Sequence, residues 1–335
     1  MREVRTLTVE AGEAGARLDR WLRRRWPHLG QSQIHRLART GQLRVDGART
    51  KADQRLAAGQ VVRVPPLPDA QPLAEPILSD RDKAFARSLV IYEDDDILIL
   101  NKPAGLAVQG GSKTPRHLDR LLSAWGEGVH RPRLTHRLDR DTSGVLALGK
   151  TPAAAAALAG AFARRRAEKT YWAIVEGNPN PARGVIELSL TKTGVGDREQ
   201  MTPGSGSDAQ SAVTLYAMIA RAGPRAAWMA LRPLTGRTHQ LRVHMLAIGH
   251  PILGDPKYHT AASREASGDL SLQLHARRLA LPHPAGGAID IEAPLSPEIE
   301  AGFARFGFDP AEADRFAGFP EIEETHHDRN RRRPR

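Results

Sequence analysis

The sequence predicts an α+β protein in two parts. Short apolar runs with the alternation of strands far outnumber long amphipathic helices, and several runs adjoin through short turns. Strands joined in this way pair antiparallel, so we expect a mixed, largely antiparallel sheet rather than a doubly wound one. Residues 66–88 are rich in Pro, Ala and Asp and are expected to form a linker. They separate a small part, residues 1–65, from a larger part, residues 89–300, which an extension at 301–335 follows.

The small part has the pattern helix, helix, strand, turn, strand. Leu18, Leu22 and Trp26 recur at helical spacing, with arginines on the other faces. Pro27 is expected to end this first helix. The elements expected after it are a helix at 32–40, a strand at 43–45, a turn at 46–47 and a strand at 61–64.

Positive charge is concentrated in the small part. The whole chain has a formal net charge of +11, and residues 1–65 hold 14 Arg and Lys against 6 Asp and Glu, a surplus of 8. A basic block of this size fits an electrostatic grip on the phosphates of a nucleic acid. It fits a well-solvated helical surface equally well, so the charge alone leaves both interpretations open.

The larger part is dominated by short strands. Two of its apolar runs flank an acidic turn at 93–96, and Thr151-Pro152 is an N-cap and first-turn signal for an Ala-rich helix. The Arg-rich tip at 329–335 is expected to be disordered. The expected strands lie at 90–92, 97–100, 145–148, 171–175, 212–219 and 227–231, and the expected helices at 152–163 and 239–248.

Composition excludes several classes of site. Without cysteine the chain cannot form disulfides, Cys-ligated zinc sites, iron–sulfur clusters or a thiol nucleophile. It lacks a phosphate-binding glycine loop, and His239 and His244 are five residues apart rather than the four of a zinc-binding helix, so we expect neither cofactor nor metal. Its most apolar run, 152–163, is too short for a bilayer, and the N-terminal residues lack the apolar core of a signal peptide. We therefore expect a soluble, cytoplasmic protein.

Three segments combine polar residues and glycine between apolar strands. They are NKPAGL at 101–106, HRLDRDTSG at 136–144 and GRTHQLRVH at 236–244. Each alone fits a capped turn or a solvated helix start. Together they predict a cationic cleft around one ionised acid, Asp139, because neighbouring arginines favour the charged form of a carboxylate. Such an anion is a candidate nucleophile or base.

These segments, in this order, resemble the RluA-type pseudouridine synthases. The resemblance continues through GHPILGD at 249–255, Tyr258 and LHA at 274–276, and covers roughly residues 89–295. At 109–112 the sequence QGGS resembles the RluC branch, where many other relatives have His. The resemblance implies a catalytic domain with a mixed, largely antiparallel sheet around a central cleft. It also implies an isomerase that flips a uridine out of its stack and rejoins the uracil through carbon.

The resemblance further implies roles for single residues. Asp139 would be the catalytic carboxylate, and Arg242 would pair with it and hold it ionised. Tyr171 would stack on the target base and could take part in proton removal. Whether Asp139 attacks the uracil ring or the ribose stays open. The other residues implied for the substrate are Arg137, which would fill the space of the flipped uridine, and His136, Lys102, Pro103, Leu241, Thr142 and Arg237.

The small part resembles the alpha-L RNA-binding module, a small α/β unit whose two helices present basic residues to RNA. This implies RNA contacts by Arg36 and Arg39. The further candidates are Arg23, Arg24, Arg25 and Arg44. RluA-type enzymes with this module ahead of the catalytic domain mostly act on large-subunit ribosomal RNA. We therefore expect a monomer whose partner is 23S rRNA or an assembling large ribosomal subunit.

Three alternatives remain at the level of sequence. The enzyme could act on transfer RNA, as RluA-type enzymes without the module tend to do. A non-catalytic RNA-binding or ribosome-assembly protein could keep the fold without the reaction, although the set of Asp139, Tyr171 and Arg242 argues against it. An Asp-dependent hydrolase would need a second carboxylate to activate water, and Asp141, two residues from Asp139, is a weak candidate.

Overall fold

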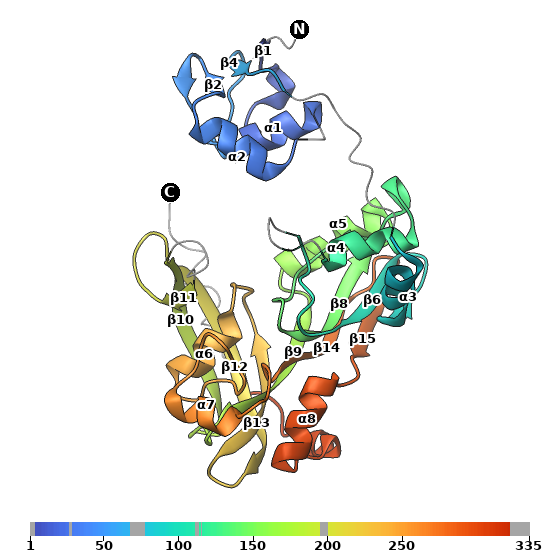
Figure 1. Cartoon of the computed structure of the whole chain (residues 1–335), viewed down its shortest axis with the longest axis vertical. Coiled ribbons are helices and arrows are strands. Elements are labelled where there is room, and N and C mark those ends of the chain that lie inside the picture. The colour runs from blue at the N-terminus through green and yellow to red at the C-terminus, as the bar shows by residue number, and fades with distance from the viewer. Residues whose placement is uncertain are drawn as a thin grey trace. The chain divides into compact units, whose positions relative to one another are not determined.

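A computed structural model describes residues 4–26, 29–67, 78–110, 114, 116–194 and 200–321 (Figure 1). The chain divides into two compact units, residues 1–77 and 78–335. Each unit contains hydrophobic clusters of its own. The RluC-like Gly111 and Ser112, and the Arg-rich tip, lie outside the described residues.

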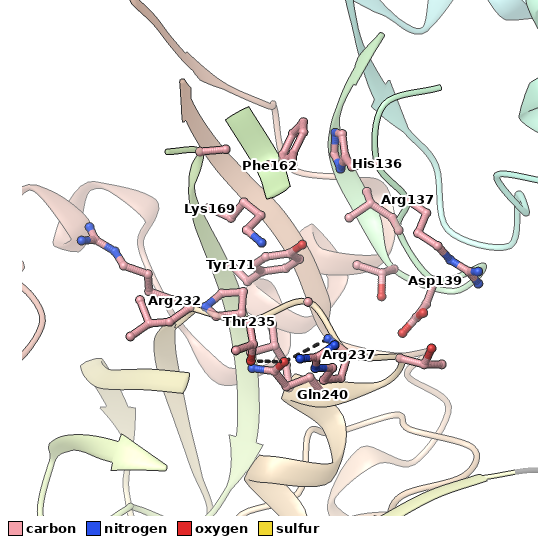
Figure 2. Close-up of a pocket in the computed structure, with 18 of the residues that line it drawn as sticks. His136, Arg137, Asp139, Phe162, Lys169, Tyr171, Arg232, Thr235, Arg237 and Gln240 are labelled. Atoms are coloured by element: carbon pink, nitrogen blue, oxygen red, sulfur yellow. Dashed lines mark hydrogen bonds between the residues drawn. The ribbon is translucent and has the colours of Figure 1, made fainter. Parts of the chain in front are cut away.

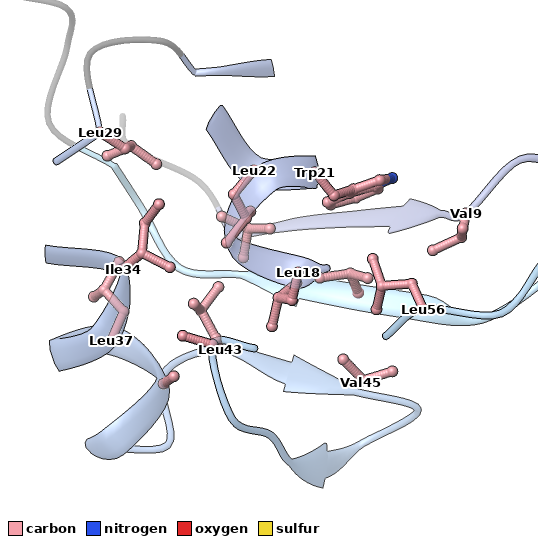
Figure 3. Packing of buried hydrophobic residues seen from close by; sticks show 14 residues of the cluster. Val9, Leu18, Trp21, Leu22, Leu29, Ile34, Leu37, Leu43, Val45 and Leu56 are labelled. Atoms are coloured by element: carbon pink, nitrogen blue, oxygen red, sulfur yellow. The ribbon is translucent and has the colours of Figure 1, made fainter. Parts of the chain in front are cut away.

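The N-terminal unit packs two short helices against a four-stranded antiparallel sheet of order β1-β4-β2-β3. Leu18 and Leu22 are fully buried, as their spacing indicates, and Ile34 of the second helix meets them in one core (Figure 3). The buried tryptophan of the first helix is Trp21, whereas Trp26 only packs against the core from outside. The elements are β1 (Arg5–Thr8), α1 (Leu18–Arg25), α2 (Gln31–Arg39), β2 (Arg44–Val45), β3 (Ala48–Arg49) and β4 (Val61–Val64).

The second unit, residues 78–335, contains the domain that the resemblance implies is catalytic, and we call it the catalytic unit. It is built on an eleven-stranded sheet whose main path runs β11-β10-β12-β13-β9-β14-β8-β6-β5. Strands β14 and β8 are parallel, and the other pairs are antiparallel, so the predicted mixed, largely antiparallel sheet is confirmed. The strands are β5 (Val90–Glu93), β6 (Ile97–Lys102), β7 (Arg133–Leu134), β8 (Ser143–Gly149), β9 (Glu168–Glu176), β10 (Arg183–Thr193), β11 (Gln200–Pro203), β12 (Gln210–Ala222), β13 (Ala226–Pro233), β14 (Leu274–Pro282) and β15 (Ala288–Glu292).

Both faces of the sheet are covered near β6 and β8. Ile97 and Ile99 pack with Leu158 of α5 on one face, whereas Leu98 and Leu100 belong to the cluster with α3 and α4 on the other. Burial on both faces explains why these strands are continuous apolar runs without alternation. The helices of this unit are α3 (Asp80–Ser88), α4 (Leu118–Leu121), α5 (Pro152–Ala163), α6 (Gln240–Ala247), α7 (Ala261–Ser267) and α8 (Pro297–Phe306).

Two predicted boundaries differ from the structure. The linker was expected to reach residue 88, but Ser79 caps helix α3, whose Ala86 is buried in the catalytic unit. The catalytic domain was expected to end at residue 300, but α8 crosses that position, and its Phe303 ring lies 4.8 Å from the ring of Trp228. Because these contacts join residues far apart in the chain, composition alone could not reveal them.

Gly144 allows β8 to lie close to its parallel partner β14, just after the polar loop that precedes β8. Its φ of 112° lies where only glycine is comfortable. A Cβ at this position would lie 2.2 Å from the carbonyl oxygen of Ala276 on β14. The glycine of HRLDRDTSG therefore permits the close approach of β8 to β14, directly after the loop that contains Asp139.

Candidate active site

A cavity of about 640 Å³ opens at this loop. Its wall is formed by the loop 135–142, the end of α5 with the residues that follow it, strand β9, the end of β13, the turn 234–239 with the first turn of α6, and Leu274 of β14 (Figure 2). This volume lies within the range of small-molecule sites and suits a single nucleotide. The predicted residues that line it are His136, Arg137, Asp139, Thr142, Tyr171, Arg237, Leu241 and Arg242.

Asp139 and Tyr171 lie across the cavity from each other, Asp139 on the loop before β8 and Tyr171 on β9 (Figure 2). The Asp139 side chain is 21% exposed, so solvent and ligand can reach the carboxylate. Burial, helped by the charge of Asp139, raises the pKa of Tyr171 above its ordinary value. Tyr171 therefore keeps its proton near neutral pH, which favours its use as a ring surface over its use as a base.

Arg242 does not pair with Asp139 as predicted. Its Nε and Nη2 donate to the two carboxylate oxygens of Asp255, each at 2.6 Å, and both side chains are almost completely buried. Asp255 also accepts from the backbone nitrogens of Lys257 and Tyr258. A fully desolvated carboxylate requires a bidentate cation more than the partly hydrated Asp139 does, which explains the difference.

The pKa of Arg242 reflects this pairing. Burial would lower it, but the hydrogen bonds and charge of Asp255 raise the pKa, with a smaller contribution from the charge of Asp139. Arg242 thus acts on Asp139 through the field of the cavity rather than through a direct ion pair.

Lys102 and Pro103 were predicted to shape the cleft, and the structure places them behind the cavity wall rather than in it. The Lys102 Nζ is fully buried and donates to the backbone carbonyls of Pro103, Leu106 and Arg140 at 2.9–3.0 Å. It thereby ties the NKPAG turn to the loop that bears Asp139. Burial lowers the pKa of Lys102 to about 7, although nearby carboxylates, led by Asp141, oppose the shift.

His136 forms a wall of the cavity. Its Nε2 accepts a hydrogen bond from the backbone nitrogen of Ala147 at 2.9 Å, and its ring packs on Phe162 with 4.2 Å between centroids. Burial, helped by the charge of Lys169, lowers the pKa of His136 to about 3. The ring is therefore neutral, and its accepting nitrogen is already used by the fold.

The cavity is cationic. Its lining carries two carboxylates, Asp139 and Glu168, and Glu168 lies 3.4 Å from the Arg232 guanidinium. Walls of one sign concentrate oppositely charged ligands, so this field suits a polyanion. The cations among the lining residues are Arg137, Arg165, Lys169, Arg232, Arg237 and Arg242.

The part of the chain that contains most of this site matches a known protein family. Residues 96–247 match the RNA pseudouridylate synthase family. The "Ribosomal large subunit pseudouridine synthase C" of Vibrio vulnificus is 35% identical over 310 residues, which cover 90% of this chain and 97% of that protein. The chain belongs to the RNA pseudouridylate synthase family. A protein of the same name from Yersinia pestis is 36% identical over 88% of this chain and 93% of its own length.

Solved structures of the same family share the fold. "Human RNA Pseudouridylate Synthase Domain Containing 4" has a TM-score of 0.56 and 28% identity, over 68% of this chain and 97% of that structure. "Human RNA Pseudouridylate Synthase Domain Containing 1" has a TM-score of 0.54 and 26% identity, over 69% of this chain and 96% of its own. The predicted family, fold class and enzyme class are confirmed, and the matched region contains Asp139 and Tyr171.

The candidate RNA contacts of the N-terminal unit fall into two groups. Arg36 and Arg39 are exposed and share one face of α2, because they are three residues apart. Arg25 has a different environment: its guanidinium lies 2.7 Å from Glu13 and 3.9 Å from the ring centroid of Trp21. Arg25 therefore stabilises the unit and is a poor candidate for an RNA contact. The remaining candidates, Arg23, Arg24 and Arg44, are exposed.

Sequence reasoning missed a second set of side chains at the cavity. His239 lies 4.0 Å from Asp139, from Nε2 to Oδ2, and its Nδ1 lies 2.8 Å from the hydroxyl of Tyr258. Both residues fall inside the segments that carry the family resemblance, so the signal was present. Their pairing was hidden because 19 residues separate them in the chain.

Among the described residues, no helix has both the length and the apolar character needed to cross a membrane. The same residues contain no group of three or more His, Asp or Glu side chains placed to hold a metal ion.

Proposed function

We propose that this chain isomerises specific uridines of large-subunit ribosomal RNA to pseudouridine, with Asp139 as the catalytic carboxylate. The observation that carries the proposal is the reachable Asp139 carboxylate, which faces the half-buried Tyr171 ring in a cavity lined by cations. The choice of RNA rests on the relatives, whose names specify the large ribosomal subunit and which match about nine-tenths of this chain. We further propose that the chain acts as a cytoplasmic monomer, as the resemblance to the RluA-type enzymes implies.

The reaction is balanced without any added reagent. The bond between uracil N1 and ribose C1′ breaks, the detached uracil turns within the cavity, and a bond forms between its C5 and the same C1′. The C5 proton is lost and N1 gains a proton, so the product is an isomer of the substrate. The protein must therefore supply a carboxylate, a surface for the ring and a site closed enough to retain the free base.

Different residues of the cavity supply these contributions. The Tyr171 ring offers the stacking surface, and stacking on an aromatic side chain is worth about 1–3 kcal/mol per base. Leu241 adds an apolar contact to the wall. Arg137, exposed and two residues before Asp139, is placed to occupy the space that the flipped uridine leaves. These contacts offset part of the few kcal/mol needed to unstack the base.

Pseudouridine mapping of total RNA tests the proposal. A strain that lacks the gene is complemented with the wild type, with Asp139→Asn, or with Asp141→Asn as the matched control. Asp141 lies two residues away, and its Oδ1 is already paired with Arg140 Nε at 2.9 Å. We expect discrete 23S rRNA sites to vanish in the deletion strain and to return with the wild type and with Asp141→Asn, but not with Asp139→Asn.

The other outcomes have separate meanings. Sites that vanish from transfer RNA instead would contradict the choice of substrate but not the reaction. Restoration by Asp139→Asn would contradict the catalytic assignment. An RNA profile that does not change on deletion, together with no activity of the purified protein on 23S rRNA transcripts, would contradict the proposed function.

A further inference from the structure

His239 begins helix α6 with an unusual backbone conformation. Its φ of 54° and ψ of 19° are left-handed, a region that residues other than glycine adopt uncommonly. The side chain makes no capping hydrogen bond to the described part of the helix, so helix capping does not account for the choice of residue. Strained backbone of this kind is concentrated at functional sites.

The ring of His239 is held from one side by Tyr258. The Tyr258 hydroxyl accepts a hydrogen bond from the backbone nitrogen of Met201 at 2.9 Å and lies 2.8 Å from His239 Nδ1. A hydroxyl has one hydrogen to donate, and Nδ1 is the acceptor that the described structure offers it. His239 Nδ1 is then an acceptor, which places the ring proton on Nε2. The two rings also pack edge to face, with 5.4 Å between their centroids.

The Nε2–H of this tautomer faces the candidate catalytic carboxylate, Oδ2 of Asp139, at 4.0 Å. The other charged groups around the ring are Arg242, Lys257 and Asp255. Burial lowers the pKa of His239 despite the opposing charge of Asp139, so the ring is neutral at neutral pH. A neutral donor can orient a carboxylate and leave its negative charge in place, whereas an imidazolium would neutralise it.

The direct contact with Asp139 that the sequence assigned to Arg242 is not formed in the structure, because Arg242 is bound to Asp255. We propose that His239, locked by the Tyr258 hydroxyl, is the positioning residue that donates its Nε2–H to the Asp139 carboxylate once uridine occupies the cavity. The present 4.0 Å is longer than a hydrogen bond, and such contacts commonly tighten when the substrate binds. The inference rests on the proposed role of Asp139.

The left-handed backbone of His239 allows a test that separates a structural role of this residue from a positioning role. His239→Asn and His239→Gly replace the ring with residues that prefer the left-handed conformation, so a purely structural role predicts unchanged or higher melting temperature with unchanged turnover. We expect instead that kcat falls about 10- to 100-fold, by analogy with the loss seen when a hydrogen-bond partner that orients a metal-bound side chain is removed. KM on a 23S rRNA transcript that carries a mapped uridine should stay within about twofold, since the ring orients the carboxylate rather than binding RNA.

Two further variants complete the design. Tyr258→Phe removes the hydroxyl alone and should lower kcat less than His239→Asn, and the double variant should lose little beyond His239→Asn because the two residues act as one unit. His250→Asn is the matched control: His250 follows the same helix, and its Nδ1 contacts the carbonyl of Glu176 instead. Its kcat should equal that of the wild type.

Wild-type kcat in both His239 variants would overturn the proposal, as would additive losses in the double variant. If the His239 variants fail to fold, Tyr258→Phe decides: reduced kcat at an unchanged melting temperature supports the proposal, and wild-type kcat refutes it. Full activity of Asp139→Asn on the same transcript would instead refute the proposed function, whatever His239 does.

Discussion

The two units of this chain use charge in opposite ways. In the N-terminal unit the candidate RNA-contacting arginines, such as Arg36 and Arg39, are exposed, although Asp19 of the same unit is buried. In the catalytic unit Lys102, Arg242 and Asp255 are buried and held by hydrogen bonds of 2.6–3.0 Å. An exposed charge acts through its field and is screened by salt, whereas a buried charge acts through geometry and is costly to leave unpaired. Each unit should therefore respond to a different perturbation.

Lowering the pH should produce the largest difference in stability between the two units. His244 and His275 are fully buried in the catalytic unit, and burial lowers the pKa of each to about 4. The unfolded chain, with its ordinary pKa near 6.5, binds these protons first, so stability is unaffected above pH 6.5 and falls as the pH drops towards 4. At pH 4.5 each histidine should lower the free energy of unfolding by about 2–3 kcal/mol, from about 1.4 kcal/mol per pKa unit.

Urea unfolding of the full chain between pH 7 and pH 4.5 measures this effect. The catalytic transition should weaken steeply, and His244→Leu should reduce its pH slope by about one proton. The N-terminal transition serves as the internal comparison, because the two buried histidines lie in the catalytic unit. Equal acid sensitivity of both transitions would remove the contrast.

Removing one partner of the buried ion pair should have the next largest effect. Asp255→Asn leaves the Arg242 guanidinium buried without its carboxylate, and should cost about 3–5 kcal/mol in the free energy of unfolding. A paired replacement with apolar residues, Arg242→Met with Asp255→Leu, should recover most of that stability but not the activity. A loss below 1 kcal/mol in the single variant would show that the pair is not desolvated as the structure indicates.

The exposed arginines should affect RNA affinity rather than stability. Neutralising two phosphate contacts, in Arg36→Gln with Arg39→Gln, should weaken RNA binding and lower the slope of log K against log salt by about 2. Turnover on saturating RNA should stay unchanged. Arg25→Gln is the informative comparison, because it should destabilise the N-terminal unit through lost contacts with Glu13 and Trp21. If Arg25→Gln reduces the salt slope without loss of stability, its assignment to packing is wrong.

Surface ion pairs should have the smallest effect. Arg305 Nη1 lies 2.9 Å from Asp269 Oδ1, but the aspartate is 96% exposed. Removal of either charge, measured by thermal unfolding at low and high salt, should change stability by less than about 1 kcal/mol. A larger change would show that exposed and buried pairs differ less than the comparison assumes.

How far prediction succeeded depended on whether a feature was local. Leu18 and Leu22 share a helical face because of their spacing, and both are buried as expected. The loop with Asp139 and the strand with Tyr171 were also located correctly, since each is marked by a contiguous motif flanked by apolar strands. Trp21 was missed because a spacing of four residues leads from Leu22 to Trp26, whereas Trp21, three residues after Leu18, lies on the same buried helical face.

By itself, the sequence determined the fold class, the family and the segments that form the cavity. Hydrophobic periodicity, turn residues and ordered motifs are each contained within short stretches of chain, so they can be recognised without the tertiary structure. Only the tertiary structure decided which groups meet. Arg242 pairs with Asp255 rather than with Asp139. The buried Lys102 Nζ donates to three backbone carbonyls, and the His239 ring contacts the hydroxyl of Tyr258, 19 residues further along the chain. Each of these choices depends on which partner is more deeply desolvated, and desolvation is set by packing between segments distant in sequence.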